Sequence, residues 1–309
     1  MIRFLFLFLF PFGVFAQSPA ELKAFDYQRA DSIALHFPKK KYKAATEIAA
    51  ALTENLRTEQ EKFRAIFRWI TDNIEYNKSA QNVIETDVVV RKNKAVCQGF
   101  SNLLKEMCNS VNISCEVIAG YTKTEAKDIN KVLKKTDHAW NCVQLYGIWY
   151  LVDVTWATSK YNVVSHKYMK EFDEHYFLTP PKKFILDHYP KDNKYQFLEK
   201  PIKKKVFTHW PVYYTDYFHF NIENISLKKG VFKWRKTDTL NVSITSGVTL
   251  KNAAVLVNAD KYVTPVTLVY NEKTKQYYFN YVFPTVIKSD FTIYLNNECI
   301  AEYLIDVKK

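Results

Sequence analysis

The hydrophobic pattern changes its period once along the chain, and this change limits the fold more than any other feature. Between residues 24 and 76, apolar residues recur every three or four positions, which indicates amphipathic helices. Beyond Tyr213, short segments alternate apolar and polar residues, which is typical of strands. A chain of 309 residues also usually divides into more than one core. We therefore expect two domains, a mixed one followed by one built of strands.

The clearest predicted helix runs from Glu59 to Ile74. Thr58 precedes it and Glu61 follows three residues later, which is the spacing of a capping box that satisfies free backbone amides at a helix start. A weaker helix of the same type is expected over Ala44 to Leu56. The apolar face of the clearer helix consists of Phe63, Ile66, Phe67, Ile70 and Ile74.

The second domain is expected to be an immunoglobulin-like β-sandwich over residues 211–309. Six or seven short strands in just under 100 residues fit that architecture. The 49 aromatic residues beside only six glycines also favour a strand-rich half. The segment between Pro180 and Pro211 lacks periodicity and is expected to wrap over the first domain. The predicted strands are Val231–Trp234, Leu240–Ile244, Ala254–Asn258, Tyr277–Phe283, Phe291–Leu295 and Ile300–Val307.

The first 16 residues have the features of a cleaved secretory signal. Arg3 precedes an apolar run from Phe4 to Phe10, and the small residue Ala16 stands before Gln17. The apolar run is shorter than the roughly 20 residues that span a bilayer. We expect an exported protein, periplasmic or extracellular, with no integral membrane segment after cleavage.

The chain carries a formal net charge of +12, which becomes +11 when Arg3 is removed with the signal. The lysine runs at 39–41 and 203–205 are short and adjoin Pro38 and Pro201, so they are interpreted as solvated loop ends. Nucleic-acid binding is therefore not expected. Attraction to acidic envelope polymers or lipid head groups remains compatible with the charge.

Cys97 lies where a helix is expected to begin. Phe100, Leu103, Leu104 and Met107 share one helical face behind it. Backbone amides and the helix dipole at an N-terminus favour negative charge and lower the pKa of a thiol. The position therefore predicts a thiolate near neutral pH, although a lone cysteine in such a place is more often a plain core thiol.

A tight turn at Tyr146-Gly147 is expected to join two strands. If these two residues form the loop, His138 and Asp153 become diagonal neighbours on one face, about 7–8 Å apart at Cβ or a little less. A register slip by one residue would place them on opposite faces. The predicted strands of this region are Cys115–Tyr121, His138–Leu145 and Ile148–Thr155.

Cys97, His138 and Asp153 have the chemistry of a thiol acyl-transfer enzyme. A thiolate attacks a carboxamide carbon, an imidazole carries the proton to the leaving amine, and a carboxylate orients the imidazole. Asp153 interrupts an apolar run from Ile148 to Val154, and a carboxylate buried there is costly unless it is paired. We therefore expect Asp153 to have a partner.

The same residues carry a resemblance to the transglutaminase-like superfamily, and most of all to its kyphoscoliosis-peptidase type. The resemblance includes the segment 62–74 and the later segment 176–190, covers about residues 40–210 and does not extend to the predicted sandwich. With the predicted signal it indicates an exported bacterial member. The three motifs that resemble the superfamily are Val96-Cys97-Gln98-Gly99-Phe100, Asp137-His138-Ala139-Trp140-Asn141 and Gly147-Ile148-Trp149-Tyr150-Leu151-Val152-Asp153-Val154-Thr155-Trp156.

The resemblance implies an α+β, papain-like core over residues 17–210. It also implies Cys97 as nucleophile, His138 as general base and acid, and Asp153 as the orienting carboxylate. Hydrolysis of a peptide or amide bond and cross-linking to an amine share a thioester acyl-enzyme. We favour hydrolysis, because the sequence shows no site that excludes water.

The substrate cleft is expected to involve Gln98, Trp140 and Trp156, with the core as the alternative place for the two tryptophans. An oxyanion hole is expected from the Cys97 amide and one donor that the sequence does not identify. His188 is interpreted as a structural residue away from the triad.

No metal and no organic cofactor are expected, because no Cys/His cluster has zinc spacing and no acidic loop resembles an EF-hand. Cys108, Cys115, Cys142 and Cys299 allow three disulfide pairings, and Cys142 is expected to pack behind the site.

The competing hypothesis is a non-enzymatic envelope module that binds a peptide or glycan. Its positive charge, export and second domain would suit that function. The presence of a thiol, an imidazole and a buried carboxylate in one place favours the enzyme.

Overall fold

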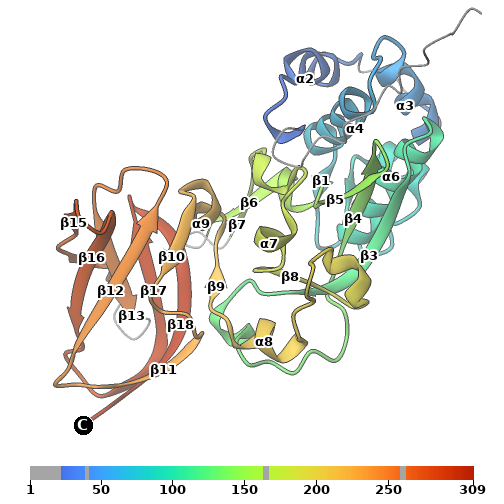
Figure 1. The fold of residues 1–309 in the computed structure, drawn as a ribbon. Coiled ribbons are helices and arrows are strands. Elements are labelled where there is room, and N and C mark those ends of the chain that lie inside the picture. Colours follow the sequence, from blue (N-terminus) through green and yellow to red (C-terminus); the bar gives the residue numbers. More distant parts are fainter. Residues whose placement is uncertain (1–21, 39–41, 163–166, 258–261) are drawn as a thin grey trace, which may run out of the picture.

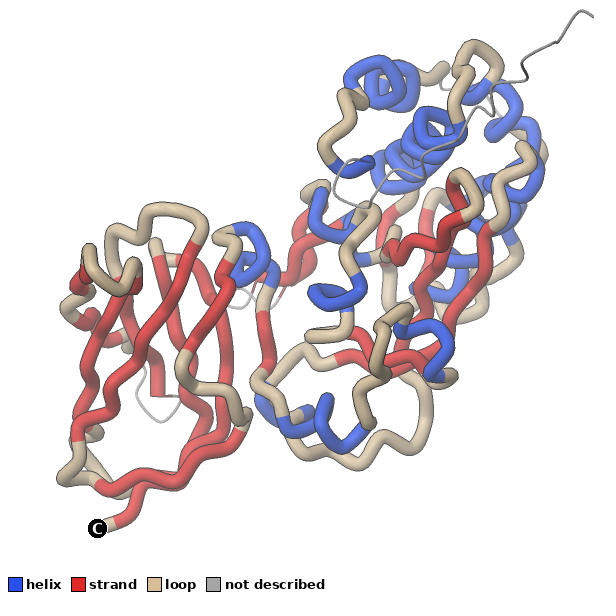
Figure 2. Tube along the Cα trace, viewed as in Figure 1, coloured by secondary structure: helices blue, strands red, loops and turns tan. Residues whose placement is uncertain are grey.

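The computed structural model describes residues 22–38, 42–162, 167–257 and 262–309, which form a mixed α/β part and a C-terminal part made mainly of strands (Figures 1 and 2). The predicted signal at 1–16 lies outside the described residues. Within the described ranges no helix combines the length and the apolar character needed to cross a membrane.

Helices gather at the end of the molecule that is far from the C-terminal strands (Figure 1). Helix α4 has the predicted capping box, because Thr58 accepts from the Glu61 amide and the Glu61 side chain accepts from the Thr58 amide. One of the helices, α5, lies in the polar stretch 81–94 that gave no helical prediction. The helices of this part are α2 (Gln28–Leu35), α3 (Ala45–Thr53), α4 (Glu59–Asn73), α5 (Thr86–Lys92) and α6 (Cys97–Ser110).

The central sheet of the first part is antiparallel and has the strand order β5-β4-β3-β8. The predicted turn is present, since Tyr146 and Gly147 have φ values of 52° and 82°, as a two-residue hairpin of this type requires. The register is the one that this turn dictates, with Leu145 opposite Ile148 and Asn141 opposite Val152. The strands are β3 (Cys115–Thr122), β4 (His138–Leu145), β5 (Ile148–Val152) and β8 (His188–Pro190).

Helix α6 packs against one face of this sheet, where the Asn141 amide donates to the Ser101 carbonyl at 3.0 Å. Side chains alternate along a strand, so His138 and Trp140 point to the opposite face. That second face is covered by the return of the chain, in which Phe184 of α7 (Pro181–Phe184) contacts the Trp140 ring. The segment expected only to wrap over the domain therefore also adds a strand, β8, to its sheet.

Short elements complete the first part of the chain and its connection to the second. Parallel strands β1 and β2 come before and after α5, and β6 and β7 form a separate hairpin. These elements are β1 (Glu75–Tyr76), β2 (Lys94–Ala95), η1 (Ala126–Asp128), η2 (Trp156–Thr158), β6 (Ser159–Asn162), β7 (Lys167–Lys170), η3 (Glu174–Tyr176), η4 (Asn193–Gln196), α8 (Lys204–His209), β9 (Val212–Tyr213) and α9 (Thr215–His219).

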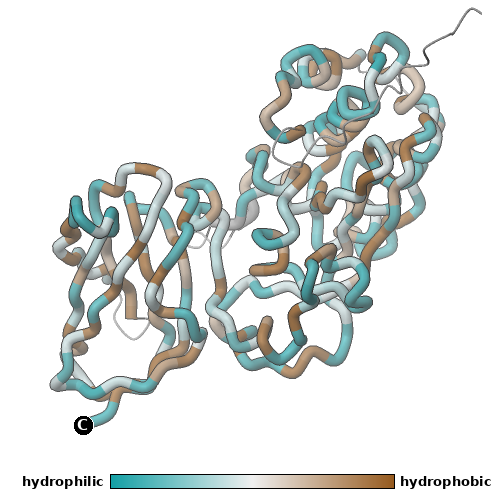
Figure 3. Tube along the Cα trace, in the orientation of Figure 1, coloured by the Kyte–Doolittle hydropathy of each residue, from teal (hydrophilic) through white to brown (hydrophobic). Residues whose placement is uncertain are grey.

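The C-terminal part is a β-sandwich with a common apolar core between two sheets, and apolar and polar residues alternate along its strands (Figure 3). The sheets have the orders β10-β12-β16-β15 and β11-β18-β17-β13-β14. This arrangement is that of an immunoglobulin-like sandwich whose first strand is divided between the sheets. The strands are β10 (Ile222–Ile225), β11 (Val231–Arg235), β12 (Thr239–Ser246), β13 (Ala253–Val257), β14 (Thr264–Val266), β15 (Val269–Asn271), β16 (Gln276–Val282), β17 (Ile287–Leu295) and β18 (Glu298–Lys308).

The two parts are joined by polar contacts as well as by the chain. The buried Lys123 ammonium donates to the Pro211 carbonyl at 2.8 Å and to the Trp210 carbonyl at 3.2 Å. Lys160 forms an ion pair with Asp216 at 2.8 Å. These contacts therefore link the start of the sandwich part to the segment after β3 and to β6 of the first part.

Candidate active site

Cys97 is the first residue of α6 and its side chain is half-buried. The N-cap residue, Val96, makes no side-chain hydrogen bond to the helix, so it leaves the first backbone amides uncapped. Burial raises the pKa of the Cys97 thiol, but the hydrogen bond to His138 and the charge of that imidazole lower it by more. The net result is a thiol pKa below its ordinary value, which is the predicted direction, although the cause is His138 and the Ala139 amide instead of the helix start.

Asp153 holds the imidazole that faces this thiol. Its Oδ2 lies 2.5 Å from Nε2 of His138, which confirms the predicted contact across the hairpin. Its Oδ1 accepts from the backbone amides of Thr155 at 2.8 Å and Trp156 at 2.9 Å. These two bonds turn the chain, so β5 ends at Val152 instead of continuing to Thr155 as predicted.

The electrostatics of this pair follow from its burial. Asp153 is completely buried and His138 keeps 9% of its surface exposed. Burial opposes charge on both groups, yet their mutual attraction and hydrogen bond raise the pKa of His138 to about 10 and hold the pKa of Asp153 well below its usual range. Because Nε2 is engaged by the carboxylate, Nδ1 is the nitrogen that remains for the thiol.

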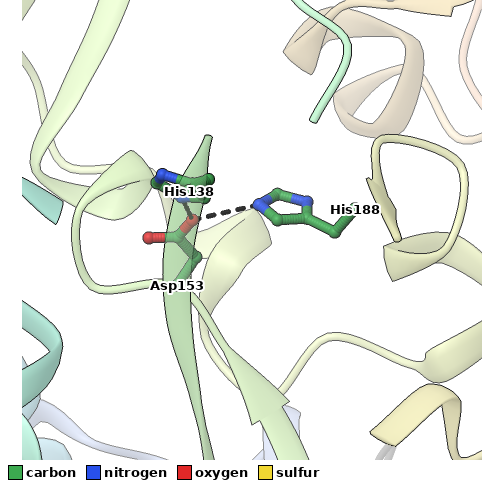
Figure 4. A group of neighbouring side chains, drawn as sticks. All are labelled: His138, Asp153 and His188. Carbon is green, nitrogen blue, oxygen red and sulfur yellow. Dashed lines mark hydrogen bonds and ion pairs between the residues drawn. The ribbon is translucent and has the colours of Figure 1, made fainter. Parts of the chain in front are cut away.

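His188 also belongs to this site, and the interpretation of it as a residue away from the triad was wrong. Its Nε2 lies 3.0 Å from Asp153 Oδ2 (Figure 4). Its Nδ1 lies 2.6 Å from Oδ1 of Asp187. The cause is the pairing of β8 with β3, which sets His188 opposite Thr122 at the end of the sheet where His138 lies. The adjacent carboxylate in Asp187-His188 was the one sequence signal that could have pointed to a charged role.

Aromatic rings enclose the imidazoles. Around His188 the ring centroids of Phe184, Trp156 and Trp140 lie at 4.2, 4.4 and 5.1 Å. This packing keeps water away from the hydrogen bonds and so strengthens them.

The three residues expected to form the cleft differ in their exposure. Trp140 is only 1% exposed and lies over Gly120, where there is no side chain to displace it, so it takes the core position that was the alternative. Trp156 is half-buried beside His138, with ring centroids 5.5 Å apart. Gln98 is half-buried, and its amide donates to Asn102 at 2.8 Å.

His138, Asp153 and His188 offer three ligand atoms within 4.8 Å of one another, which is a spacing that metal ions use. The distances within the group are nevertheless those of hydrogen bonds, 2.5 and 3.0 Å to one shared carboxylate oxygen. In a tetrahedral zinc site with nitrogen and oxygen ligands at about 2.0 Å, two ligand atoms lie about 3.3 Å apart. The separation of 2.5 Å between His138 and Asp153 is much shorter than that. The arrangement therefore fits shared protons better than an ion.

All five cysteines are free thiols in the structure. Cys108, Cys115, Cys142 and Cys299 are buried, and burial raises the pKa of Cys142 to about 12. Cys97 differs from all four in exposure, and from Cys115, Cys142 and Cys299 in the direction of its pKa shift, as a reactive thiol requires.

Comparison with known proteins finds a family similarity for the segment that holds Cys97, His138 and Asp153. Residues 46–154 match the model of the Transglutaminase-like superfamily. Over 162 residues the chain is 35% identical to Kyphoscoliosis peptidase of Homo sapiens, which is 50% of this chain and 24% of that protein. Over 213 residues it is 26% identical to Hillarin of Drosophila melanogaster, which is 64% of this chain and 26% of that protein.

The chain thus spans about a quarter of the length of these curated relatives. Among solved structures it resembles one described as the crystal structure of a TGase. The match covers 41% of this chain and 31% of the other, at 18% identity and a TM-score of 0.28.

Proposed function

Because residues 46–154 form a transglutaminase-like domain, we propose that this chain is a thiol-dependent acyl-transfer enzyme acting on peptide or amide bonds. Cys97 is the nucleophile, His138 the general base and acid, and Asp153 the carboxylate that orients His138. The observation that carries the proposal is the 2.5 Å hydrogen bond between His138 and the buried Asp153, beside the half-buried thiol whose pKa His138 lowers.

The proposed reaction begins with the thiolate of Cys97 and the imidazolium of His138. The sulfur attacks the carbonyl carbon, and the C–S bond forms while the carbonyl electron pair moves to the oxygen. When the C–N bond breaks, His138 gives its proton to the leaving amine. The products of this half are a free amine and a thioester on Cys97.

The second half restores the thiolate. Neutral His138 takes a proton from the acceptor, which attacks the thioester carbon, and the C–S bond breaks. Water as acceptor gives a carboxylic acid, and a primary amine gives a new amide. We propose that hydrolysis predominates, since the half-buried Cys97 is open to water in this structure.

The uncapped amides at the start of α6 support the electrostatic part of this mechanism. Uncapped amides and the helix dipole at this end favour negative charge on the thiolate and on an oxyanion formed beside it, and the backbone amide of Ala139 also lowers the pKa of the thiol. The amide of Cys97 itself is the proposed first oxyanion donor. Asp153 keeps His138 Nε2 protonated, so that Nδ1 exchanges protons with sulfur and substrate.

The first test of the proposal is the rate of Cys97 alkylation by iodoacetamide as a function of pH, with mass spectrometry of the modified peptide. An activated thiolate reacts fully well below pH 7, whereas an ordinary thiol follows a pKa of about 8.5. The buried cysteines are internal references. An ordinary profile would contradict the enzyme and favour a binding module.

The second test separates the two outcomes of the thioester. The chain is incubated with a peptide library, with and without a fluorescent primary amine, and products are identified by mass. Cleavage or deamidation supports hydrolysis, whereas incorporation of the amine supports cross-linking. Cys97→Ser should lose either activity, and binding of a peptide by Cys97→Ser shows that the loss concerns chemistry.

We also propose that the protein is exported, with a signal at 1–16, a catalytic domain at 17–210 and a sandwich at 211–309. Its substrates are then peptides or proteins of the envelope or outside the cell, and acidic polymers suit its charge. Expression of the full chain followed by N-terminal sequencing tests this. A mature protein beginning at Gln17 supports export, and retention of Met1 contradicts it.

A further inference from the structure

His188 is placed between two carboxylates, and this position determines its charge. Its Nδ1 faces Oδ1 of Asp187 at 2.6 Å and its Nε2 faces Oδ2 of Asp153 at 3.0 Å. An ionised carboxylate only accepts hydrogen bonds, so each of the two ring nitrogens must carry a proton. A histidine with both nitrogens protonated is an imidazolium. His188 and Asp153 are fully buried and Asp187 is 1% exposed, so water cannot replace either partner.

The oxygen that accepts from His188 also accepts from His138 (Figure 4). We propose that His188 is a permanently charged positioning residue, which fixes Asp153 toward His138 and, by its positive charge, favours the thiolate of Cys97. This role rests on the proposed function of Cys97 as a nucleophile. His188 does not touch the sulfur, and it acts through Asp153 and His138.

The sign of the effect follows from the alternation of charges along the line of side chains. Going outward from the sulfur, the charges are negative on Cys97, positive on His138, negative on Asp153, positive on His188 and negative on Asp187. The ring centroids of the two histidines are 5.6 Å apart. A unit charge roughly 10 Å from a sulfur, at an effective dielectric constant of about 20, shifts its titration by about one pH unit.

The negative charge of Asp153 opposes ionisation of the Cys97 thiol, and the positive charge of His188 offsets part of this effect. Without His188 the thiolate would therefore form at higher pH. The groups that face His188 or its two carboxylates are Lys123 after β3, His138 on β4, Asp153 after β5, His175 and Tyr176 on η3, and Asp187 before β8.

The experiment measures the pH dependence of Cys97 alkylation in the wild-type chain and in His188→Gln. Glutamine keeps a hydrogen-bond donor for Asp153 and removes the charge. We expect the acid limb of the profile to move upward by about one pH unit. If His188 were merely structural, the donor of glutamine would preserve the profile, so an unchanged or lowered midpoint would overturn the proposal.

His219 supplies a matched control. It too lies between carboxylates, 2.9 Å from Asp173 and 3.4 Å from Asp216, but it has no contact with Asp153. His219→Gln removes the same group from between two carboxylates, at a position where the side chain is 41% exposed instead of buried, and should leave the alkylation profile unchanged. An equal shift in both variants would mean that the effect is general and would overturn the specific role of His188.

A second measurement does not depend on the fold of a variant. Nitrogen-15 spectra of the seven histidines in the wild-type chain report which ring nitrogens carry protons. Besides the imidazolium proposed for His138, we expect a further doubly protonated ring that stays so from pH 5 to 9 and is absent in His188→Gln. If that variant fails to fold, Asp187→Asn identifies the ring, because loss of the second anion should release its Nδ1 proton. A neutral His188 at pH 7 would overturn the proposal.

The two proposals fail in different ways. If wild-type Cys97 titrates like an ordinary thiol, the proposed function fails at its first step. If wild-type Cys97 is activated and His188→Gln behaves identically, the enzyme stands and only the role of His188 is refuted.

Discussion

Asp153→Asn should disable the site through the tautomer of His138. In the structure, Oδ1 of Asp153 accepts two backbone amides, from Thr155 and Trp156. An asparagine would keep its carbonyl oxygen there, so its NH₂ group would point at His138. Two donors cannot share a hydrogen bond, and His138 would have to present an unprotonated Nε2 and move its proton to Nδ1. The nitrogen that faces the thiol would then be the wrong one for a base.

The magnitude follows from the charge that is lost. Unit charges about 4 Å apart at an effective dielectric constant of about 20 attract by about 4 kcal/mol, which is about 3 units of pKa. The pKa of His138, raised to about 10 beside Asp153, should therefore fall to about 7 in the variant. The imidazolium would be lost before the thiol ionises, and the thiolate of Cys97 would lose its partner.

Two measurements check this prediction. The midpoint of Cys97 alkylation should rise toward the ordinary value of about 8.5. Turnover of any substrate found should fall by about 10⁴-fold, the loss that an equivalent change causes in another acyl-transfer triad. The matched control is Asp137→Asn, which changes a neighbouring aspartate that bonds to the Thr122 amide at 2.9 Å. A wild-type alkylation profile in Asp153→Asn would refute the reasoning.

Three further predictions concern stability. Gly120→Ala should lower the free energy of unfolding by about 3 kcal/mol in urea titration, because its methyl group would overlap the Trp140 ring and a backbone carbonyl of β8. An effect below 1 kcal/mol would contradict this prediction. Thr58→Ala should cost about 1 kcal/mol in the same assay through loss of the capping box at Glu61, and an unchanged midpoint would contradict that role. Hydrogen bonds to two carboxylates raise the pKa of His219 to about 9, so its ion pairs should be complete below pH 6.5 and lost as the pH rises through 9. The difference in unfolding free energy between wild type and His219→Gln should therefore shrink over that pH range. A difference that does not change with pH would contradict this prediction.

The local pattern of the sequence predicted much of the site, because its key contact is a local one. Tyr146-Gly147 fixes the hairpin turn, the turn fixes the register, and the register places His138 beside Asp153. The start of α6 at Cys97 was likewise a matter of local periodicity. Both predictions concern residues that lie close in sequence, where few alternatives compete.

What the sequence could not predict depends on long-range pairing. Strand β8 has three residues and reaches β3 after more than 60 intervening residues, so no periodicity announces that His188 returns to the sheet. The burial of Trp140 depends in the same way on Gly120, a residue of another strand. Edge strands of three residues, such as β14 and β15, are too short for an alternating pattern to be recognised.

The site also extends beyond the segment that identifies its family. The family match ends at residue 154 and so includes Cys97, His138 and Asp153, whereas Asp187 and His188 lie outside it. A buried charge is tolerated only beside an opposite one. In the proposed reaction His138 gives up its proton, so the buried Asp153 carboxylate then needs a second positive partner. In the mechanism proposed above, His188 remains charged at that moment and still pairs with Asp153. In that mechanism the proton can leave His138 while the buried Asp153 carboxylate still has a charged partner, which the returning strand β8 supplies.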